Sequence, residues 1–348
     1  MYFASDNAGP AHPTVMDAMV AANTGYQMGY GADTLMDGVR AQIREAFEAP
    51  DAMVHLVATG TAANSIILAT MAKPWEAIFC SPMAHIHEDE CNAPEFYSGA
   101  KLTLVPAKNA KMTPDALRAT MAAEETRGVH GPQRGPVSIT QVTEKGTVHT
   151  LDEIRALTSV AKEFGVTTHL DGARFTNAMV ALGCSAADMT WKAGIDAVSF
   201  GGTKNGLMGV EACVIFNPDL AWEFELRRKR GGHLFSKHRY LSAQMQAYLT
   251  DDLWITMAAA ANAACARLTV GMRDISGVEL AFEPEANIIF FRTTRARHKA
   301  VQDGGAVYYV MDGELDTGPA DQILTGRLVT DWSTTDEAVD QFLALLRG

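Results

Sequence analysis

Four sites in the sequence carry side chains that could do chemistry, and each directly follows a short apolar run. Gly60 and Thr61 follow one run, in "ATGTAAN", and His85 follows the next, in "SPMAHIHEDE". Asp171 ends a third run, in "THLDGARF", and Lys204 follows a fourth, in "SFGGTKNG". Short apolar runs predict buried strands, and an open parallel sheet binds ligands at the carboxyl ends of its strands. The four sites are therefore predicted to lie together at one edge of a sheet.

Lys204 is the long cation of the set, and its position after a buried strand has two interpretations. A lysine in a small-residue turn commonly extends its ammonium group into water. If the ammonium group is instead desolvated near other cations, its pKa falls and the neutral amine attacks carbonyl carbons. Gly201, Gly202 and Gly206 flank it and would let the backbone turn tightly beneath a ligand.

Asp171 and the pair Gly60 and Thr61 also allow a structural or a functional role. A helix start offers free backbone N–H groups and the positive end of the helix dipole, so Gly60 and Thr61 could bind a phosphate. They could equally form an ordinary strand-to-helix turn. Asp171 could cap the next helix, or it could pair with a cationic ring nitrogen and keep that nitrogen protonated.

His85 and His87 lie two residues apart, so they share no helix face. A metal site would need His85, His87 and Glu90 together, which this spacing does not favour, and we expect no metal. Two surface histidines are the plain alternative. The functional alternative is that the flat imidazole of His85 lies on an aromatic cofactor.

In combination, a phosphate turn, a carboxylate for a ring nitrogen, a planar imidazole and a buried amine indicate pyridoxal phosphate (PLP) held as a Schiff base on Lys204. One helical stretch separates Asp171 from Lys204, which fits two neighbouring strands. A nucleotide-binding α/β protein is the alternative without PLP. The sequence has neither GxxxxGK[ST] nor GxGxxG, and that alternative leaves Lys204 without a role.

The elements that would position these residues form an α/β pattern. Seven apolar runs alternate with amphipathic stretches and predict one wide, mostly parallel sheet; they are 53–61, 76–82, 101–107, 137–142, 166–172, 196–202 and 210–216. The clearest helix covers 150–165, where Thr150 and Glu153 form a capping box and Gly165 ends the helix. The stretch 128–136 is predicted to be a surface loop.

A second, smaller α+β domain is predicted near the carboxyl terminus. A long helical pattern at 251–277 is followed by two apolar strands and a terminal helix. We expect a large domain over 15–245 and a small domain formed by 1–14 and 246–348.

The composition excludes several classes of protein. The 348 residues carry a net charge of −12, which does not suit a nucleic-acid surface. The five cysteines show no CxxC spacing, so neither a disulfide framework nor a zinc site is indicated, and a reducing cytoplasm fits best. The start "MYFASDNAGP" lacks a signal-peptide pattern, and we expect no stretch long and apolar enough for a membrane span. A small-molecule partner is expected, without nucleic acid or membrane.

Whole motifs give the chain a resemblance to the fold type I PLP enzymes and, within them, to the L-threonine aldolases of the β-eliminating lyase group. The motifs are, in chain order, "SDNAGP", "MGYGAD", "TGTAAN", "AHIHEDE", "LDGARFTNA", "TKNG" and "GRLVTDW". They run nearly end to end and are specific as a set. The resemblance implies cleavage of L-threonine, L-allo-threonine and related L-β-hydroxy-α-amino acids, phenylserine included, to glycine and an aldehyde. Another fold type I reaction, such as β-elimination or transamination, is the alternative.

The resemblance also implies roles for residues at the matching positions. Lys204 would hold the cofactor, Asp171 would pair with its ring nitrogen, and His85 would stack on its ring. The further residues implied are Gly60 and Thr61 for the phosphate, with Lys237, Arg239 or Lys229 from the basic cluster 225–239 of a neighbouring subunit; Ser5, Arg174 and Arg327 for the substrate carboxylate; and Tyr30 near the substrate. A homotetramer built from dimers with shared active sites is implied as well.

Glu144, in "TQVTEKGTV", departs from the family pattern, because some members carry a second active-site histidine there. The sequence therefore leaves the base for the substrate β-hydroxyl group open. His85, a water molecule and Glu144 are the candidates.

Overall fold

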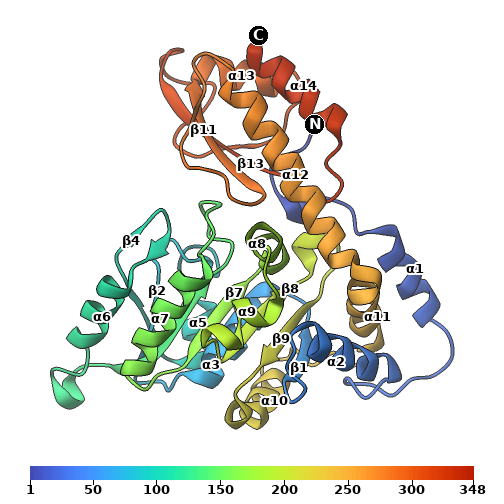
Figure 1. Cartoon of the computed structure of the whole chain (residues 1–348), viewed down its shortest axis with the longest axis vertical. Helices are drawn as coiled ribbons and strands as arrows, with labels where there is room; N and C mark the ends of the chain where they lie inside the picture. Colours follow the sequence, from blue (N-terminus) through green and yellow to red (C-terminus); the bar gives the residue numbers. More distant parts are fainter.

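A computed structural model describes all 348 residues and has a wide sheet between layers of helices, with a smaller sheet and its helices beside it (Figure 1). The predicted seven strands form the wide sheet, in the order β1 (Met53–Val57), β9 (Glu211–Ile215), β8 (Ala197–Gly201), β7 (Thr168–Gly172), β6 (Gln133–Thr140), β2 (Glu76–Cys80) and β3 (Lys101–Leu104). β9 is antiparallel to β1 and β8, and all other pairs are parallel. The prediction of a mostly parallel sheet is confirmed.

Successive residues of the strands contribute to apolar layers on opposite faces of the sheet. In β1, Val54 and Leu56 belong to the main core, whereas Val57 belongs to a cluster on the other face. The helices over the main core are α2 (Thr34–Ala46), α6 (Pro114–Ala123), α7 (Leu151–Glu163), α8 (Phe175–Leu182), α9 (Ala186–Met189) and α11 (Arg239–Leu249). The helices over the other face are α3 (Gly60–Met71), α4 (His85–Glu88), α5 (Ala93–Ser98) and α10 (Ala221–Arg230). Burial on both faces explains why these strands are continuous apolar runs.

The helix predicted at 150–165 is α7, and its capping box is confirmed. The Thr150 hydroxyl accepts the N–H of Glu153 at 3.2 Å, and the Glu153 carboxylate accepts the N–H of Thr150 at 2.7 Å. Gly165 has a φ of +69°, a left-handed conformation that favours glycine at the end of a helix.

Several predicted strand boundaries are wrong. The strand predicted for 53–61 ends at Val57, and the strand predicted for 137–142 ends at Thr140. β3 ends at Leu104, and β4 (Ala107–Lys108) instead forms a short hairpin with β5 (Lys111–Met112). β6 begins at Gln133, inside the loop predicted for 128–136, because its backbone pairs with Glu76 of β2. Pairing satisfies the backbone polar groups of this segment, so its polar side chains do not prevent strand formation.

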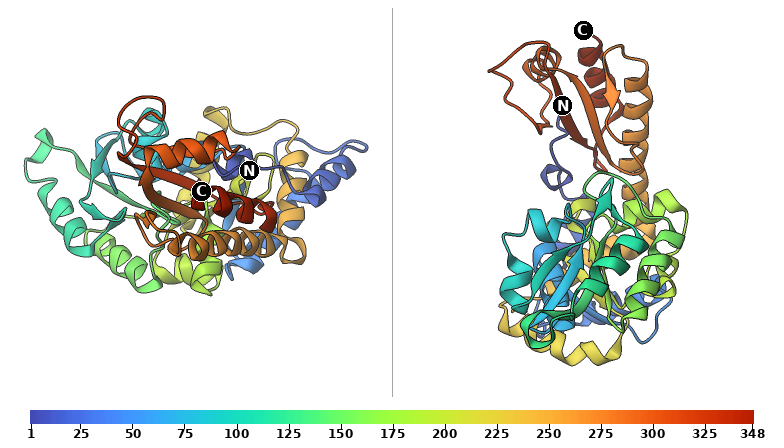
Figure 2. Two further views of the ribbon diagram at one scale, coloured as in Figure 1. Left: turned by 90° about the horizontal axis from the view of Figure 1, so that it is seen from above. Right: turned by 90° about the vertical axis from the view of Figure 1, so that its left-hand side faces the viewer.

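The smaller sheet is antiparallel, in the order β10 (Glu279–Leu280), β11 (Ile288–Thr294), β13 (Ile323–Val329) and β12 (Tyr309–Val310). Its helices are α12 (Leu253–Arg273), α13 (Arg295–Asp303) and α14 (Asp336–Arg347), and together they enclose a separate core (Figure 2). Phe3 joins this core from the amino terminus, and its N–H donates to the Val307 carbonyl oxygen at 2.8 Å. The smaller α+β unit is confirmed, whereas the limits 15–245, 1–14 and 246–348 stay a prediction.

The expectation that no stretch is apolar and long enough for a membrane span is wrong by length and composition. The 35-residue helical segment Arg239–Arg273 has a mean hydropathy of 1.3 in its most apolar window. It consists of α11 and α12, which are separated by Asp251 and Asp252 with φ of +52° and +54°. α11 is covered by α1 (Pro13–Ala22) and α2, and α12 packs on α8 and α14, so the segment is a core helix pair.

Candidate active site

A pocket of about 230 Å³ lies at the carboxyl edge of the large sheet. It brings together the four sites that the sequence places after strands, and five of the predicted residues line it: Gly60, Thr61, His85, Asp171 and Lys204. A larger hollow of about 690 Å³ lies between α1, α2 and α11. Asp251 is the single ionisable residue in its lining, so the chemistry is concentrated in the smaller pocket.

Lys204 lies in the short turn η4 (Thr203–Asn205), directly after β8. Gly202 has no room for a side chain, because a Cβ atom there would meet a backbone carbonyl oxygen at 2.6 Å. Gly206 has a φ of +92°, which favours glycine. Burial, together with Arg174, lowers the pKa of the Lys204 ammonium group. The neutral amine is therefore more populated than in an exposed lysine.

Asp171 is buried at the end of β7, where two donors orient its carboxylate. Asn64 donates Nδ2 to Asp171 Oδ2 at 3.0 Å, and the N–H of Ala173 donates to Oδ1 at 3.1 Å. The alternative that Asp171 caps the following helix is wrong, since α8 begins at Phe175 with Arg174 at its N-cap.

Gly60 and Thr61 are the first two residues of α3, after the N-cap Thr59. The Thr59 hydroxyl accepts the N–H of Ala62 at 3.2 Å. The first N–H groups of a helix have no partner within it, and the space beside the Gly60 Cα atom is open. This helix start can therefore accept an anion from the pocket.

His85 is the first residue of α4, and its side chain is partly exposed to the pocket. Its Nδ1 lies 2.9 Å from Glu90 Oε1, and this hydrogen bond raises the pKa of the imidazole. His87 instead lies 3.6 Å from Glu88. No group of three His, Cys, Asp or Glu side chains is arranged to hold a metal ion.

Glu144 lies behind His85 and does not line the pocket. Its Oε1 accepts the backbone N–H of His85 at 2.6 Å, and its Oε2 is buried without a partner. Burial raises the pKa of Glu144 to about 7. The carboxyl group can therefore hold or release a proton near neutral pH.

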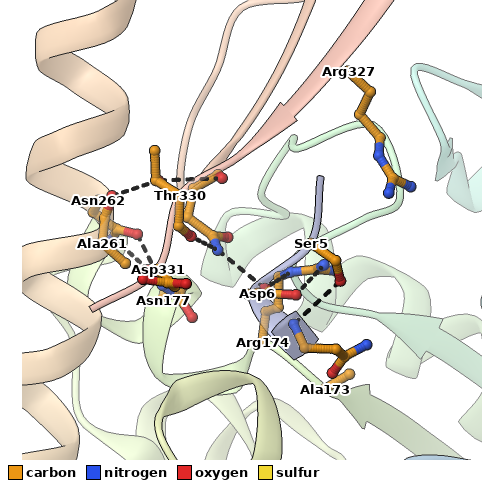
Figure 3. A network of polar contacts seen from close by, with 12 residues as sticks. Ser5, Asp6, Ala173, Arg174, Asn177, Ala261, Asn262, Arg327, Thr330 and Asp331 are labelled. Carbon is orange, nitrogen blue, oxygen red and sulfur yellow. Dashed lines mark hydrogen bonds and ion pairs between the residues drawn. The ribbon is translucent and has the colours of Figure 1, made fainter. Parts of the chain in front are cut away.

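The two arginines predicted to bind the substrate carboxylate lie beside the pocket, in the region between the two sheets (Figure 3). Arg174 donates Nε to Asp6 Oδ2 at 2.6 Å and Nη2 to Oδ1 at 3.0 Å. Burial alone would raise the pKa of Asp6, but Arg174 and Lys204 hold it below its ordinary value. Arg327 donates Nη2 to the Ala4 carbonyl oxygen at 3.0 Å, and its Nε is buried without a partner.

Ser5 lies in the same network, at the N-cap of the short turn η1 (Asp6–Ala8). Its hydroxyl accepts the N–H of Asn7 at 3.1 Å. Asn287, just before β11, donates Nδ2 to Asp6 Oδ2 at 3.2 Å and to the Thr330 carbonyl oxygen at 2.8 Å. Asp6 thus connects the large sheet to the smaller one.

Tyr30, Lys237 and Arg239 do not line the pocket of their own chain. The Tyr30 hydroxyl accepts a hydrogen bond from Ser236 at 3.4 Å, and the Lys229 ammonium group lies 4.8 Å from the centre of the Tyr30 ring. Arg239 donates to the Gly25 carbonyl oxygen at 3.0 Å. A role in the site requires that these residues come from another copy of the chain, and it stays a prediction.

Four polar residues of the site were absent from the sequence prediction or had another role there. Asn64 and Glu211 line the pocket, Asp6 binds Arg174, and Glu90, considered only as a metal ligand, binds His85. Asn64 follows Gly60 by one helical turn, and Asp6 lies in the motif "SDNAGP", so their positions were weak signals. Nothing in the sequence near Glu211 distinguishes it from an ordinary strand residue.

The residues of the pocket fit PLP. Lys204 has no ion pair and can reach an aldehyde, Asp171 presents an oriented carboxylate, and the free N–H groups at Gly60 suit a phosphate. Asn64 Oδ1 is buried there without a partner, which is typical of a site built for a polar ligand. A seven-stranded, mostly parallel sheet with this lysine and aspartate at its carboxyl edge defines an α/β enzyme of the PLP-dependent fold type I.

Comparisons with known proteins agree with this class. A family model described as "Beta-eliminating lyase" matches residues 2–295. The low specificity L-threonine aldolase of Pseudomonas aeruginosa is 40% identical over 99% of this chain and 96% of its own length. The corresponding protein of a Pseudomonas species is 39% identical over 99% and 97%. The structure of Leishmania major threonine aldolase has a TM-score of 0.92 at 27% identity, and covers 99% of this chain and 98% of its own. The chain belongs to the PLP-dependent β-eliminating lyase family, as predicted.

Proposed function

We propose that the protein cleaves L-threonine, L-allo-threonine and related L-β-hydroxy-α-amino acids, including phenylserine, to glycine and an aldehyde. Identity of 40% along nearly the whole chain to a low specificity L-threonine aldolase is the observation that carries this proposal. The reaction makes the protein a carbon–carbon lyase, and no feature of the pocket favours a nucleotide-binding role.

The cofactor would be held by five residues of the pocket. Lys204 would bond to its aldehyde carbon, Asp171 would bind the ring nitrogen and His85 would cover the ring, while Gly60 and Thr61 would bind the phosphate. When bound, PLP supplies an electron sink conjugated to the amino group of the substrate. Lys237 or Arg239 of a second copy would complete the phosphate site, in the proposed homotetramer built from two dimers.

The substrate carboxylate would be held by Arg327 and Arg174. Asp6 accepts one N–H from Nε and one from Nη2 of Arg174, which leaves Nη1 and the second Nη2 N–H free, whereas Arg327 also keeps its Nε free, so Arg327 would provide the larger share of the binding. Ser5 would contribute a hydroxyl group, and Tyr30 of a neighbouring copy would lie near the side chain. Fixing the carboxylate sets the torsion about Cα, and this orientation selects the bond that breaks.

His85 would take the proton of the substrate β-hydroxyl group. It lines the pocket, whereas Glu144 does not and accepts the backbone N–H of His85. Glu144, with its pKa raised by burial to about 7, would serve as a proton store behind His85. We also infer a cytoplasmic location, in which PLP and free amino acids are available.

The test is incubation of the PLP-loaded protein with L-threonine, L-allo-threonine and L-phenylserine. Glycine and the matching aldehyde, in equal amounts, are the expected products. Ammonia with a keto acid would instead indicate β-elimination, and an amino-group acceptor requirement would indicate transamination. Either result would overturn the proposed reaction while leaving the PLP site intact.

A further inference from the structure

A continuous set of hydrogen bonds connects His85, which is proposed to cover the cofactor ring, with Asp171, which is proposed to bind the ring nitrogen. His85 Nδ1 lies 2.9 Å from Glu90 Oε1. Asn64 donates Nδ2 to that same Glu90 oxygen at 2.9 Å and to Asp171 Oδ2 at 3.0 Å. The four side chains all line the pocket, although Asn64 comes from α3, His85 from α4, Glu90 from the turn after α4 and Asp171 from β7.

The Glu90 carboxylate lies in an environment that is unusual for a charged group. Its side chain is fully buried, and its Oε2 has no hydrogen-bond partner. A buried carboxylate is stable only where donors compensate the lost hydration. The only side-chain donors that reach Glu90 are His85 and Asn64. Glu90 is therefore a buried acid that contacts the His85 imidazole directly and the Asp171 carboxylate through Asn64. The proposed mechanism gives it no role.

The contact decides which nitrogen of His85 carries a proton. A carboxylate accepts hydrogen bonds and has none to donate, so Nδ1 must donate its N–H to Glu90. In the neutral ring the other nitrogen, Nε2, then carries the free electron pair. Nε2 has no protein partner, so it is the nitrogen available to a substrate hydroxyl group.

We propose that Glu90 is a positioning residue that holds His85 in the Nδ1–H tautomer, and that Asn64 fixes Glu90 and Asp171 in one orientation. The proposal rests on the proposed function in one respect, namely that His85 Nε2 accepts the substrate proton. Asn64 suits the bridging role because its amide nitrogen has two N–H donors, one for each carboxylate. Asn64 also lies between the Glu90 and Asp171 carboxylates and stabilises both by donating a hydrogen bond to each.

Four charged or titratable groups face His85. Glu90 and Asp171 raise the pKa of the imidazole, Lys204 lowers it, and Glu144 lies at its backbone N–H. The hydrogen bond from Glu90 is the largest of these influences. Loss of the Glu90 charge is therefore expected to lower the His85 pKa.

The test compares wild-type protein with Glu90→Gln, both loaded with PLP and labelled with ¹⁵N-histidine. The His85 signals are assigned by their loss in His85→Gln. We expect the Nδ1–H tautomer and a raised pKa in the wild type, and a lower pKa in Glu90→Gln. Glu88→Gln, which removes an exposed carboxylate on the same helix, should leave both values unchanged.

The pH dependence of turnover gives a second readout. The acid limb of kcat should move to lower pH in Glu90→Gln, and kcat should fall by no more than the roughly 10²- to 10⁴-fold that a general base supplies. The KM for L-threonine and the absorbance of bound PLP should change little. An Nε2–H tautomer of His85 in the wild type would overturn the proposal, and this measurement does not require that a Glu90 variant folds. An unchanged His85 pKa in Glu90→Gln would overturn it as well. Because the tautomer and pKa are measured without turnover, absence of aldol cleavage would count only against the proposed function.

Discussion

Arg174 donates two hydrogen bonds to Asp6, a residue 168 positions earlier in the chain, at 2.6 and 3.0 Å. Arg174 follows β7, and Asp6 lies in a segment that leads from the smaller sheet. The pair leaves one guanidinium nitrogen of Arg174 free for a ligand. It also compensates positive charge where Arg174, Arg327 and Lys204 lie close together, which allows the three cations to share one site.

The first prediction concerns this pair. Asp6→Asn removes the buried carboxylate that pairs with the partly buried Arg174, and breaking such a pair typically costs about 3–5 kcal/mol of unfolding free energy. Urea unfolding measures the loss. The matched control is Asp37→Asn, whose exposed carboxylate binds Arg40 at 2.9 Å and should change stability by less than about 1 kcal/mol. Equal losses of unfolding free energy in the two variants would show that the Asp6–Arg174 pair stabilises the fold no more than an exposed ion pair does.

The second prediction concerns Lys204. Lys204→Ala removes the amine proposed to bond the cofactor, so the visible absorbance of bound PLP should disappear and turnover should fall by roughly 10³-fold or more. Absorbance spectra and glycine release after reconstitution provide the measurement. Lys192→Ala, which removes an exposed ion pair with Glu48, serves as the control and should keep both properties. Retention of absorbance and turnover in Lys204→Ala would contradict the assignment.

The third prediction concerns Arg327. Its Nε is buried without a partner, so a carboxylate from the substrate can restore a charge-assisted hydrogen bond there. Such a bond is worth about 1.5–3 kcal/mol, and Arg327→Gln should raise the KM for L-threonine roughly ten- to a hundred-fold. Arg292→Gln, at an exposed position of the neighbouring strand β11, should leave KM unchanged. A lower kcat with unchanged KM would assign Arg327 to another step.

The fourth prediction concerns the pH dependence of stability. Burial raises the pKa of Glu144 to about 7 from an ordinary value of 4.5, so the folded state binds this proton more tightly than the unfolded state. The stability from this group is complete below about pH 4.5 and is lost as the pH rises through 7, with a total of about 3 kcal/mol. Glu144→Gln should therefore stabilise the protein at pH 8 and have little effect at pH 4.5. Urea unfolding at both pH values measures the difference, with the exposed Glu45→Gln as control.

Local sequence patterns were sufficient to predict the large sheet and the position of the four sites. Seven apolar runs became seven strands because strands buried on both faces need no polar alternation, and Thr150 with Glu153 marked a helix start that the backbone requires. The boundaries at Leu104 and Gln133 were missed, since a strand end depends on its pairing partner and not on its own side chains.

The sequence by itself determined the sheet, the family and the set of residues after the strands, because each follows from short-range periodicity or from motifs contiguous in the chain. Only the tertiary structure decided which polar groups contact one another. Asp6 binds Arg174, Glu90 binds His85, and Asn64 joins Glu90 to Asp171, which lies 107 positions after Asn64. These contacts join residues from different elements, and burial makes them decisive, because a buried charge must find its partner wherever the fold brings one.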